Sequence, residues 1–374
     1  MESQCRILMV NGSFSMSRIL FISAQAPTNQ YPQAGQRIAF THLSEYAVAN
    51  EVVDIVVIAN KVEVDAAKDL VAKFGSNLYT YPLHQFDKIA SCLTHYQVPV
   101  KFASRLINTV ERKIQKLLAT NIYDTIHFEC SHAAIYFEAI EKYINPTQTK
   151  TVISLRDVWT QVFLRQSVSN FFYGIEVART FHYERQLYSR VGELWVSSTK
   201  DRDLLTSLFS IPSERITIKP HQASCFVYRV QRCLEKIEKK SLLFWGAIGR
   251  PENEQAILTF VEQCFKKLVQ HDRDFKLYIV GSSPSQKVLA LACKQIIVTG
   301  FVEDPTEFFE KAEIGIVPLF KGGGIKLKTL EMLEAGLPVI ATAVGAEGIV
   351  DRRKKLVVSD NFEEWFDLIR IMIR

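Results

Sequence analysis

The chain has 374 residues, of which 48% are hydrophobic and 23% are charged, and its formal net charge at pH 7 is +5. This length is too great for one ordinary hydrophobic core and predicts two domains, while the composition is that of a globular protein. The modest positive charge is compatible with anionic substrates or an acidic membrane surface, but it lacks the dense basic stripe of a nucleic-acid binder, so no nucleic-acid partner is expected.

A segment similar in sequence to the first predicted strand lies upstream of it. CRILMV (Cys5–Val10) is similar to SRILFIS (Ser17–Ser23), and Met16 directly precedes the second copy. We expect the second copy to form the first core strand, at 19–23. Residues 1–15 are then either an extension before a natural start at Met16 or an additional edge strand, and we favour the extension.

Short β-branched runs then alternate with segments long enough for crossover helices, which predicts doubly wound α/β domains with buried parallel strands. A charged stretch, RVQRCLEKIEKK, separates two series of such runs. We therefore predict two Rossmann-like domains that face each other across a cleft, at 1–225 and 241–374, with a linker at 226–240. The predicted strands are 19–23, 52–59, 151–155, 193–198, 215–220, 241–246, 275–281, 295–301, 313–319 and 337–342.

Residues that follow these strands are candidate site residues, because ligands of such sheets bind beyond the carboxyl ends of the strands. The chain has no GxGxxG after its first strand and no GxxxxGK[ST], which counts against nicotinamide-dependent and ATP-hydrolysing enzymes. In the first domain the candidate segments are PQAGQR, HFECSH and SLRDVW. Their candidate residues are Gly35, His127, Glu129, His132 and Asp157.

The most informative segment is GGGIKLKTLEMLEAGLPVIATAVGAEGI (Gly322–Ile349), which follows an apolar run and forms one βαβ-like unit. Glycines let the backbone approach a ligand closely, and the N–H groups that open the next helix attract a phosphate. Two lysines add positive charge and a glutamate follows on the helix, which suits a diphosphate attached to a ribose. The candidate ligands of this nucleotide-sugar pocket are Arg250, Gly322, Gly323, Gly324, Ile325, Lys326, Lys328 and Glu331.

These segments resemble the GT-B glycosyltransferases, most closely the retaining family 4 enzymes (glycosyl transferases group 1), and among them a subgroup with a GGG loop. The matching text is LLFWGAIGRPENEQAI and VTGFVEDPTEFFEKAEIGIVPLFKGGGIKLKTLEMLEAGLPVIATAVGAEGI, with weaker matches at YDTIHFECSH and FHYERQLYSRVGELWVSSTKDRDLL. The resemblance implies that Glu331 binds the donor ribose, that Arg250 helps to hold the diphosphate and that the glycine loop packs against it. It also implies a last helix that crosses back onto the first domain. Glu363–Arg374 is the last helix that we predict, so either this helix crosses or the chain is shortened and the closing helix is missing.

The chain departs from the family pattern at two positions. Many relatives carry a glutamate that contacts the transferred sugar where this chain has Gly323, although the subgroup with a GGG loop lacks that glutamate too. Many relatives also place a lysine shortly after the arginine, at the position of Gln255. We expect Lys326 or Lys328 to supply the missing charge, because the leaving diphosphate must be stabilised electrostatically in the absence of a metal.

Glycosyl transfer develops positive charge on the sugar and negative charge on the departing diphosphate, which cations and helix N–H groups stabilise. By resemblance, the anomeric configuration is retained and the acceptor attacks the face that the diphosphate leaves, so the diphosphate itself can take the acceptor proton. If a protein base exists, the candidates are His127, Glu129 and His132. Asp157 either points into the cleft or caps a helix.

We expect neither a metal nor a cofactor. HFECSH could bring three ligand atoms to one ion, but polar clusters at strand ends are commoner than zinc sites of this spacing. The DxD sequences at 201–203 and 272–274 read as a helix start and a polar turn. The nucleotide sugar is a co-substrate, and a UDP-sugar is preferred because UDP is the commonest nucleotide in the family.

The expected compartment is the cytoplasm. The seven cysteines are scattered without a CxxC spacing, which favours a reducing environment. No run approaches the roughly 18 apolar residues of a membrane span, and no signal peptide is recognisable. DRRKK (Asp351–Lys355) is either a solvated loop or a peripheral contact with an anionic inner membrane face or a lipid-diphosphate acceptor.

The predicted function is a retaining, metal-independent glycosyltransferase of the hexosyltransferase type. It would move a sugar from a nucleotide-sugar donor to a glycan or lipid-linked acceptor in the synthesis of a cell-surface polysaccharide or glycoconjugate. The alternative is a catalytically silent GT-B-like subunit that binds nucleotide or glycan and supports a partner, which Gly323 and Gln255 keep open. An epimerase or phosphorylase of the same fold is a third reading, although no lysine context indicates pyridoxal phosphate.

Overall fold

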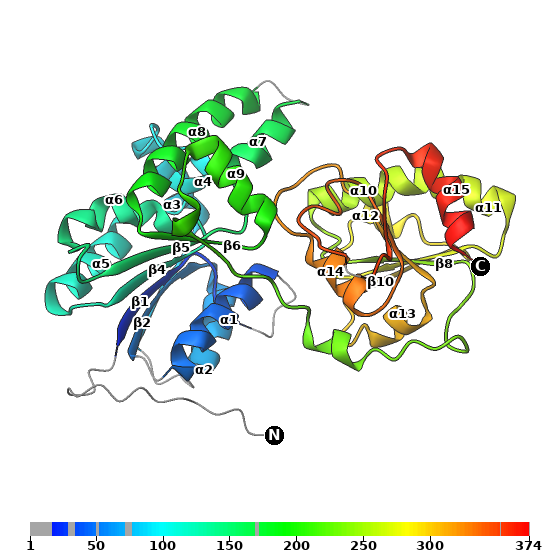
Figure 1. Cartoon of the computed structure of the whole chain (residues 1–374), viewed down its shortest axis with the longest axis horizontal. Coiled ribbons are helices and arrows are strands. Elements are labelled where there is room, and N and C mark those ends of the chain that lie inside the picture. Colours follow the sequence, from blue (N-terminus) through cyan, green and yellow to red (C-terminus); the bar gives the residue numbers. More distant parts are fainter. Residues whose placement is uncertain are drawn as a thin grey trace.

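The computed structural model describes residues 17–28, 34–49, 52–71, 77–168, 172–351 and 353–373. They form two α/β domains that lie side by side (Figure 1), each built on a parallel sheet with helices on both faces. The N-terminal stretch interpreted as an extension lies outside the described residues.

The N-terminal domain has a seven-stranded sheet. Its strands are β1 (Arg18–Ser23), β2 (Val52–Ala59), β3 (Asn77–Pro82), β4 (Thr125–Glu129), β5 (Lys150–Ser154), β6 (Glu193–Val196) and β7 (Ile216–Ile218), in the spatial order β3-β2-β1-β4-β5-β6-β7. Its helices are α1 (Ala34–Val48), α2 (Lys61–Val71), α3 (Gln85–Thr94), α4 (Val100–Ala103), α5 (Asn108–Thr120), α6 (Phe137–Ile140), α7 (Trp159–Ser167), α8 (Phe172–Arg190) and α9 (Thr199–Phe209).

The strands of this sheet are apolar on both faces because helices cover both. On one face Ile19 and Phe21 of β1 pack with Leu43 of α1 and Val64 of α2. On the other face Leu20 and Ile22 join a larger core with α5, α6, α8 and α9. Successive side chains of a strand point to opposite faces, so a strand buried on both sides becomes a continuous apolar run.

The C-terminal domain repeats the plan with six strands. They are β8 (Ser241–Trp245), β9 (Lys276–Val280), β10 (Ile296–Gly300), β11 (Ile314–Val317), β12 (Val339–Ala341) and β13 (Leu356–Val358), in the order β10-β9-β8-β11-β12-β13. The helices are α10 (Pro251–Phe260), α11 (Lys266–His271), α12 (Gln286–Leu289), α13 (Thr306–Lys311), α14 (Leu327–Glu334) and α15 (Phe362–Met372).

In each sheet the order of the strands reverses at the first strand of the domain, β1 or β8. This is the doubly wound arrangement, which has a crevice at the carboxyl ends of the strands. The prediction of two Rossmann-like domains is therefore confirmed. All ten predicted strands are present, with ends shifted by a few residues at most. Within the described residues, three further strands lie outside the predicted set: β3, β4 and β13. β3 is an edge strand whose sequence, NLYTYP, alternates in polarity and is only partly buried.

Two segments that could connect the domains, the one after the first domain and the last helix, both pack on the C-terminal domain. The segment that follows the first domain lies against the C-terminal domain, since Val227 is buried in its core and Arg232 Nη1 donates to the carbonyl of Ala312 at 2.6 Å. Helix α15 packs Trp365 and Ile369 into the C-terminal core and does not cross to the first domain, unlike the helix that the resemblance implied. In the described part of the chain, no helix is both long and apolar enough to span a membrane.

Candidate active site

The glycine loop between β11 and α14 lies against the opposite domain. Gly322 and Gly324 have φ angles of 115° and 61°, which L side chains rarely adopt. A Cβ atom on Gly323 would lie 2.6 Å from Val162 Cγ2, and one on Gly324 would lie 2.3 Å from the carbonyl oxygen of Arg156. Gly323 and Gly324 therefore permit a close approach between the two domains, which brings the first turn of α14 near the N-terminal domain.

Glu331 of α14 is a buried carboxylate with donors from both domains. Trp245 Nε1, at the end of β8, donates to it at 2.8 Å, and Ser224 Oγ also donates. Arg37 of the N-terminal domain reaches across and donates from Nη2 at 3.1 Å. Only 2% of the Glu331 residue surface is exposed, so the carboxylate lies at the floor of the junction and is held by all three groups.

Lys328 and Arg250 lie beside Glu331 on the same domain. Lys328 Nζ donates to Asn253 Oδ1 at 2.6 Å and lies 4.3 Å from the ring centre of Phe244. Gly246 makes room for it, because a Cβ there would lie 3.0 Å from Lys328 Nζ. Burial, followed by the charge of Arg250, lowers the pKa of Lys328 to about 7. The Arg250 guanidinium is about half exposed and has its acidic neighbour, Glu252, at 3.9 Å.

Lys326 is used within the loop. Its ammonium donates to the carbonyls of Gly323 and Gly324, each at 2.7 Å, and lies 3.8 Å from Glu347. Ile325 precedes it and closes the loop, with its Cγ1 3.0 Å from where a Cβ on Gly348 would lie. Lys328 therefore donates to the neutral amide of Asn253, whereas Lys326 holds the conformation of the glycine loop and also lies near a carboxylate.

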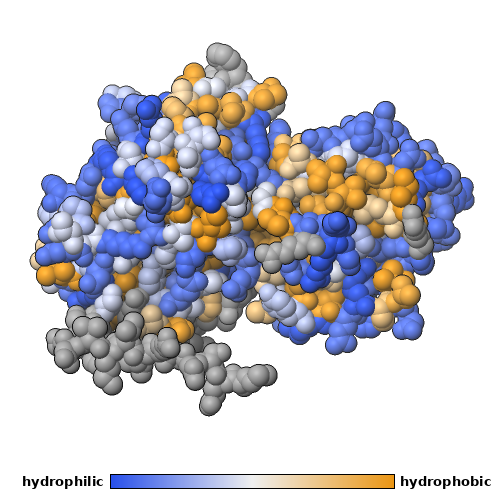
Figure 2. Space-filling model, in the orientation of Figure 1, coloured by the Kyte–Doolittle hydropathy of each residue, from blue (hydrophilic) through white to orange (hydrophobic). Residues whose placement is uncertain are grey.

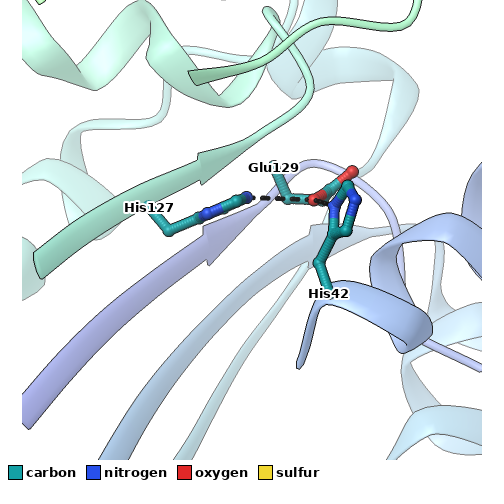
Figure 3. Close-up of side chains that lie close together, drawn as sticks. All are labelled: His42, His127 and Glu129. Atoms are coloured by element: carbon teal, nitrogen blue, oxygen red, sulfur yellow. Dashed lines mark hydrogen bonds and ion pairs between the residues drawn. The ribbon is translucent and has the colours of Figure 1, made fainter. Parts of the chain in front are cut away.

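On the N-terminal side, the side chains of His127 and Glu129 are fully buried and do not reach the surface between the domains. Figure 3 shows them pointing toward His42 of α1, which joins them in one buried cluster. His42 Nδ1 and His127 Nε2 contact Glu129 Oε2 at 2.8 and 3.1 Å, and Arg156 Nη2 donates to Oε1 at 2.9 Å. Burial alone would raise the pKa of Glu129, but the imidazoles and Arg156 outweigh burial and hold it well below its usual value.

The atoms of this cluster are also a conceivable set of metal ligands, because the three lie within 4.8 Å of one another. Each ligand atom already has a hydrogen-bond partner, and Arg156 adds a cation where an ion would bring two more positive charges. The arrangement therefore fits a carboxylate that positions Arg156 better than it fits a metal centre.

His132 and Asp157 lie nearer to the junction. His132 is separated from His127 and Glu129 and sits between Trp159 and Phe102, with ring centres 5.0 and 5.8 Å away. Burial and the charges of Lys101 and Arg105 lower its pKa well below the usual value, so it is neutral. Asp157 Oδ1 would lie 2.8 Å from a Cβ on Gly324, and burial raises the pKa of its carboxyl while Lys326 opposes that change.

Unsatisfied polar atoms gather at this junction. Gly35 lies directly behind Arg156, since a Cβ there would be 1.9 Å from Arg156 Nη1. In the described part of the chain, the buried side-chain atoms without a hydrogen-bond partner include both amide atoms of Gln36, Arg37 Nε, Arg156 Nε and His132 Nε2. Such atoms are rare in folded proteins, and their concentration near the domain junction suits a ligand rich in hydroxyl or phosphate groups.

A second set of contacts that carries no sequence motif joins the domains. Arg165 of α7 donates to both carboxylate oxygens of Glu347 at 2.7 Å and to the carbonyl of Gly322, also at 2.7 Å. Lys200 Nζ lies 3.1 Å from Glu347. Burial would raise the pKa of Glu347, but Arg165 and Lys200 lower it to about 2. This interdomain clasp (Arg165, Lys200 and Glu347) was not predicted, although Glu347 lies in the GAEGI segment of the resemblance.

Comparison with known proteins shows what the C-terminal domain and the fold are similar to. Residues 239–374 match the family model described as glycosyl transferases group 1. An uncharacterized 44.6 kDa protein in the cps region of Klebsiella pneumoniae is 24% identical over 135 residues, which covers 34% of this chain and 35% of that protein. The match thus spans about a third of the curated relative.

Solved structures match along almost the whole chain at low identity. HepE of Anabaena, solved with UDP and glucose, has a TM-score of 0.61 at 12% identity and covers 96% of this chain and 90% of its own. Sucrose-phosphate synthase of Thermosynechococcus elongatus has a TM-score of 0.69 at 14% identity, with 95% and 89% covered. S. aureus TarM, solved with UDP, has a TM-score of 0.62 at 11% identity, with 96% and 93% covered. The chain thus has the GT-B fold, and its C-terminal domain, residues 239–374, is similar to the glycosyl transferases of group 1.

Proposed function

We propose that this chain is a retaining, metal-independent glycosyltransferase. It takes a sugar from a nucleotide-sugar donor in the cytoplasm and transfers it to a glycan or lipid-linked acceptor, in the synthesis of a cell-surface polysaccharide or glycoconjugate. The observation that carries the proposal is the junction itself: a buried glutamate, a glycine loop and two cations of the C-terminal domain face orphaned polar atoms of the N-terminal domain.

In this proposal the nucleotide binds on the C-terminal domain. Glu331 accepts hydrogen bonds from the ribose hydroxyls in exchange for that of Arg37, which is then released toward the diphosphate. Trp245 Nε1 keeps the carboxylate oriented throughout. Exchange of one charge-assisted donor for neutral hydroxyls costs little when Arg37 gains a phosphate partner, because guanidinium–phosphate contacts are among the strong hydrogen bonds.

The leaving diphosphate needs positive charge in the transition state. Arg250 is half exposed and free to move onto it, and Lys328 lies within the same group of side chains. An approaching diphosphate favours the charged form of Lys328, whose pKa of about 7 leaves it partly neutral beforehand. The first N–H groups of α14 add the positive end of a helix dipole. This set of donors supports departure of the diphosphate without a metal.

The acceptor side supports attack without a dedicated protein base. His127 and Glu129 are fully buried and hydrogen-bonded to each other, which leaves neither accessible to an acceptor hydroxyl. His132 and Asp157 border the junction and remain the candidates that can contact a substrate. In our proposal they position the acceptor, and the departing diphosphate takes the proton from the attacking hydroxyl.

UDP-sugars are the first donors to test, because the HepE and TarM structures were solved with UDP. A thermal-shift screen of UDP-, GDP-, ADP- and CMP-linked sugars would be run in EDTA on the wild type and Glu331→Gln. Ligand binding raises the melting temperature by mass action. A shift with one nucleotide class that Glu331→Gln abolishes supports the proposal, and NMR of the product's anomeric proton then tests retention.

The catalytically silent subunit has a specific observation in its favour. Glu331 is already satisfied by three protein donors, and the family's sugar-contacting glutamate is replaced by Gly323. Nucleotide binding with no transfer or hydrolysis of the sugar, across a set of glycan and lipid acceptors, would support that alternative. Absence of nucleotide binding would contradict both.

A further inference from the structure

Three hydrogen-bond donors come together on the N-terminal side of the junction. Lys101 lies in α4, Arg105 follows that helix, and His132 lies in the turn after β4. The ring centre of Trp159 is 4.4 Å from Lys101 Nζ and 5.0 Å from the centre of the His132 ring. The charges of both cations also act on the His132 ring. We call Lys101, Arg105 and His132 the basic cluster.

The two cations of the basic cluster lack a carboxylate in direct contact. In the part of the chain that the structure describes, neither Lys101 nor Arg105 forms an ion pair, and Arg105 Nη1 donates to the carbonyls of Ala24 and Ile58 at 3.3 and 3.4 Å. Burial and the charge of Arg105 lower the pKa of Lys101, and Asp157 opposes this change. Burial also raises the pKa of Asp157 itself, which favours its neutral form. The positive charge of the cluster is therefore only partly balanced.

The imidazole of His132 supplies a donor without an acceptor. Cys130 Sγ lies 3.4 Å from Nδ1, while Nε2 is buried and has no hydrogen-bond partner among the described residues. Burial and the nearby cations hold the pKa of His132 well below its usual value, so the ring is neutral. When the Cys130 thiol donates to Nδ1, the single proton of the ring is on Nε2. That buried N–H then needs an acceptor, which a ligand can supply.

The basic cluster can be reached from solvent beside the opposite domain. Figure 2 shows that the molecule narrows where its two domains meet. Lys101 is exposed, and Arg105 and His132 are partly exposed. The charge of Arg250, on the C-terminal domain, also lowers the pKa of Lys101, so these two cations lie near each other across the junction. A ligand between the domains can therefore contact the cluster on one side and the proposed diphosphate position on the other.

A cavity of about 130 Å³ extends from the cluster along the edge of the N-terminal sheet. It lies at the carboxyl ends of β1, β2 and β3, and its lining includes Arg105, Gln25, Asn60, Glu63 and Lys88. Within it, Glu63 accepts a hydrogen bond from Asn60 Nδ2 at 2.7 Å. The cavity thus offers both donors and acceptors, as sugar hydroxyls require, whereas the basic cluster offers donors alone.

A phosphate suits a cluster that has donors and no acceptor. Hydroxyl groups both donate and accept, so a neutral sugar would leave its own donors without partners there. A phosphate presents three strong acceptor oxygens, one for each member of the cluster, whereas a carboxylate presents two. Hydrogen bonds from lysine and arginine to phosphate are charge-assisted and correspondingly strong. The cluster therefore favours a phosphate over a neutral hydroxyl group or a carboxylate.

We propose that the acceptor of the transfer reaction carries a phosphate group, which Lys101, Arg105 and His132 bind on the N-terminal side of the junction. The polar cavity beside Arg105 then receives hydroxyl groups of the same molecule. The phosphate belongs either to a soluble sugar phosphate or to a phosphorylated lipid carrier. That the bound molecule is an acceptor rests on the proposed function, whereas the phosphate site itself does not.

The test is isothermal titration calorimetry of the full chain, in EDTA and with saturating UDP, against glucose, glucose 1-phosphate and decyl phosphate. UDP occupies the donor site, so the phosphate probes report on a second position. Glucose 1-phosphate is expected to bind about tenfold more tightly than glucose. Decyl phosphate that binds still more tightly would assign the phosphate to a lipid carrier, and weaker binding would assign it to a sugar phosphate.

Variants of the cluster should weaken the phosphate probes selectively. Lys101→Gln/Arg105→Gln should lose about tenfold or more in affinity for both phosphate probes, because it removes two charge-assisted donors. His132→Phe, which keeps a ring beside Trp159, should lose about threefold. Because Arg105 also contacts the ends of two strands, Lys101→Gln alone replaces the double variant if that variant has a lower melting temperature.

The matched control is Arg112→Gln/Lys116→Gln. It removes the same two charges from exposed positions of α5, which lies at the far side of the N-terminal domain from the C-terminal domain (Figure 1). This variant should bind every probe as the wild type does. An equal loss of affinity in the control would mean that overall charge, and not the cluster, attracts the phosphate, and the proposal would be wrong.

Three further results would overturn the proposal. Glucose 1-phosphate could bind no better than glucose, or Lys101→Gln could keep full affinity for both phosphate probes. The Lys101→Gln/Arg105→Gln chain could also lose affinity for UDP as strongly as for the probes, and the cations would then bind the nucleotide. The first two results leave the proposed function intact. Phosphate probes that bind a chain with no response to any nucleotide sugar would contradict the proposed function and leave the phosphate site intact.

Discussion

The two sides of the cleft differ in how their candidate residues are distributed along the chain. On the C-terminal side they come from two short segments, one after β8 and one from the glycine loop into α14. On the N-terminal side they come from three segments that lie far apart in the sequence: α1, β4 with the turn after it, and the residues after β5. Backbone N–H groups bind a phosphate, so a run of consecutive glycines in the sequence can indicate a phosphate site. The other side depends on side chains that only the fold brings together.

The comparison predicts that the C-terminal side is the more sensitive to single changes. Glu331→Gln keeps the shape of the side chain but removes the negative charge that accepts hydrogen bonds from three donors. Hydrogen bonds to charged groups contribute about 1.5–3 kcal/mol, so we expect kcat/KM for the donor to fall about 100-fold. Steady-state kinetics with the donor found in the thermal-shift screen gives the value. Glu334→Gln, which alters an exposed residue of the same helix, is the control and should stay near wild type.

The sequence could predict this side because each of its signals is local. The glycine triplet, the lysines and Glu331 occupy one continuous stretch, and in the structure Lys328 interacts with both Arg250 and Glu331. The N-terminal cluster escaped prediction because His42 comes from a helix far from β4, and no spacing links it to Glu129. His132, only three residues from Glu129, is turned away because Cys130 between them adopts a left-handed conformation with φ 66°.

Substitution in the glycine loop tests whether the close approach of the two domains affects kcat/KM as much as the ligand contacts do. In Gly324→Ala the new Cβ would lie 2.3 Å from the Arg156 carbonyl, at a residue with positive φ. The conformation alone costs about 1–2 kcal/mol, and misplacement of the two domains should lower kcat/KM about tenfold or more. Gly174→Ala meets no atom within 4 Å and should have wild-type kinetics. Equal activity of the two variants would show that the loop does not need this close contact.

The interdomain clasp sharpens the comparison because none of its three residues was predicted, although Arg165 contacts the glycine loop at the carbonyl of Gly322. Arg165→Ala removes the donor to both Glu347 and the glycine loop, and we expect kcat to fall about tenfold while the donor KM changes little. The pKa of Glu347 is lowered from 4.5 to about 2, so its stabilising contribution is complete above pH 4.5 and is lost as the pH falls toward 2.

The pH range gives this prediction an independent readout. Thermal melting between pH 5 and 3 should show a fall in the stability of the wild type that Glu347→Gln largely lacks. Lys239, which faces Glu313 at 3.7 Å on the far side of the C-terminal domain, offers the control Lys239→Gln, whose pH profile should match wild type. Parallel profiles for Glu347→Gln and wild type would contradict the role assigned to the clasp.

The smallest expected effect concerns the protonation of Lys328. Burial depresses its folded-state pKa to about 7, so the side chain carries its charge below pH 7 and loses it above. A diphosphate binds the charged form better, and donor affinity measured by calorimetry should therefore fall about threefold between pH 6 and 8.5, with proton uptake at the higher pH. Lys328→Met should bind more weakly at pH 6 and show a flat profile, whereas Lys321→Met, at an exposed position in the same loop, should keep the wild-type slope. A sloping profile in Lys328→Met would assign the titration to another group, and the cation on the diphosphate would then have to be sought in Arg250 or on the N-terminal side.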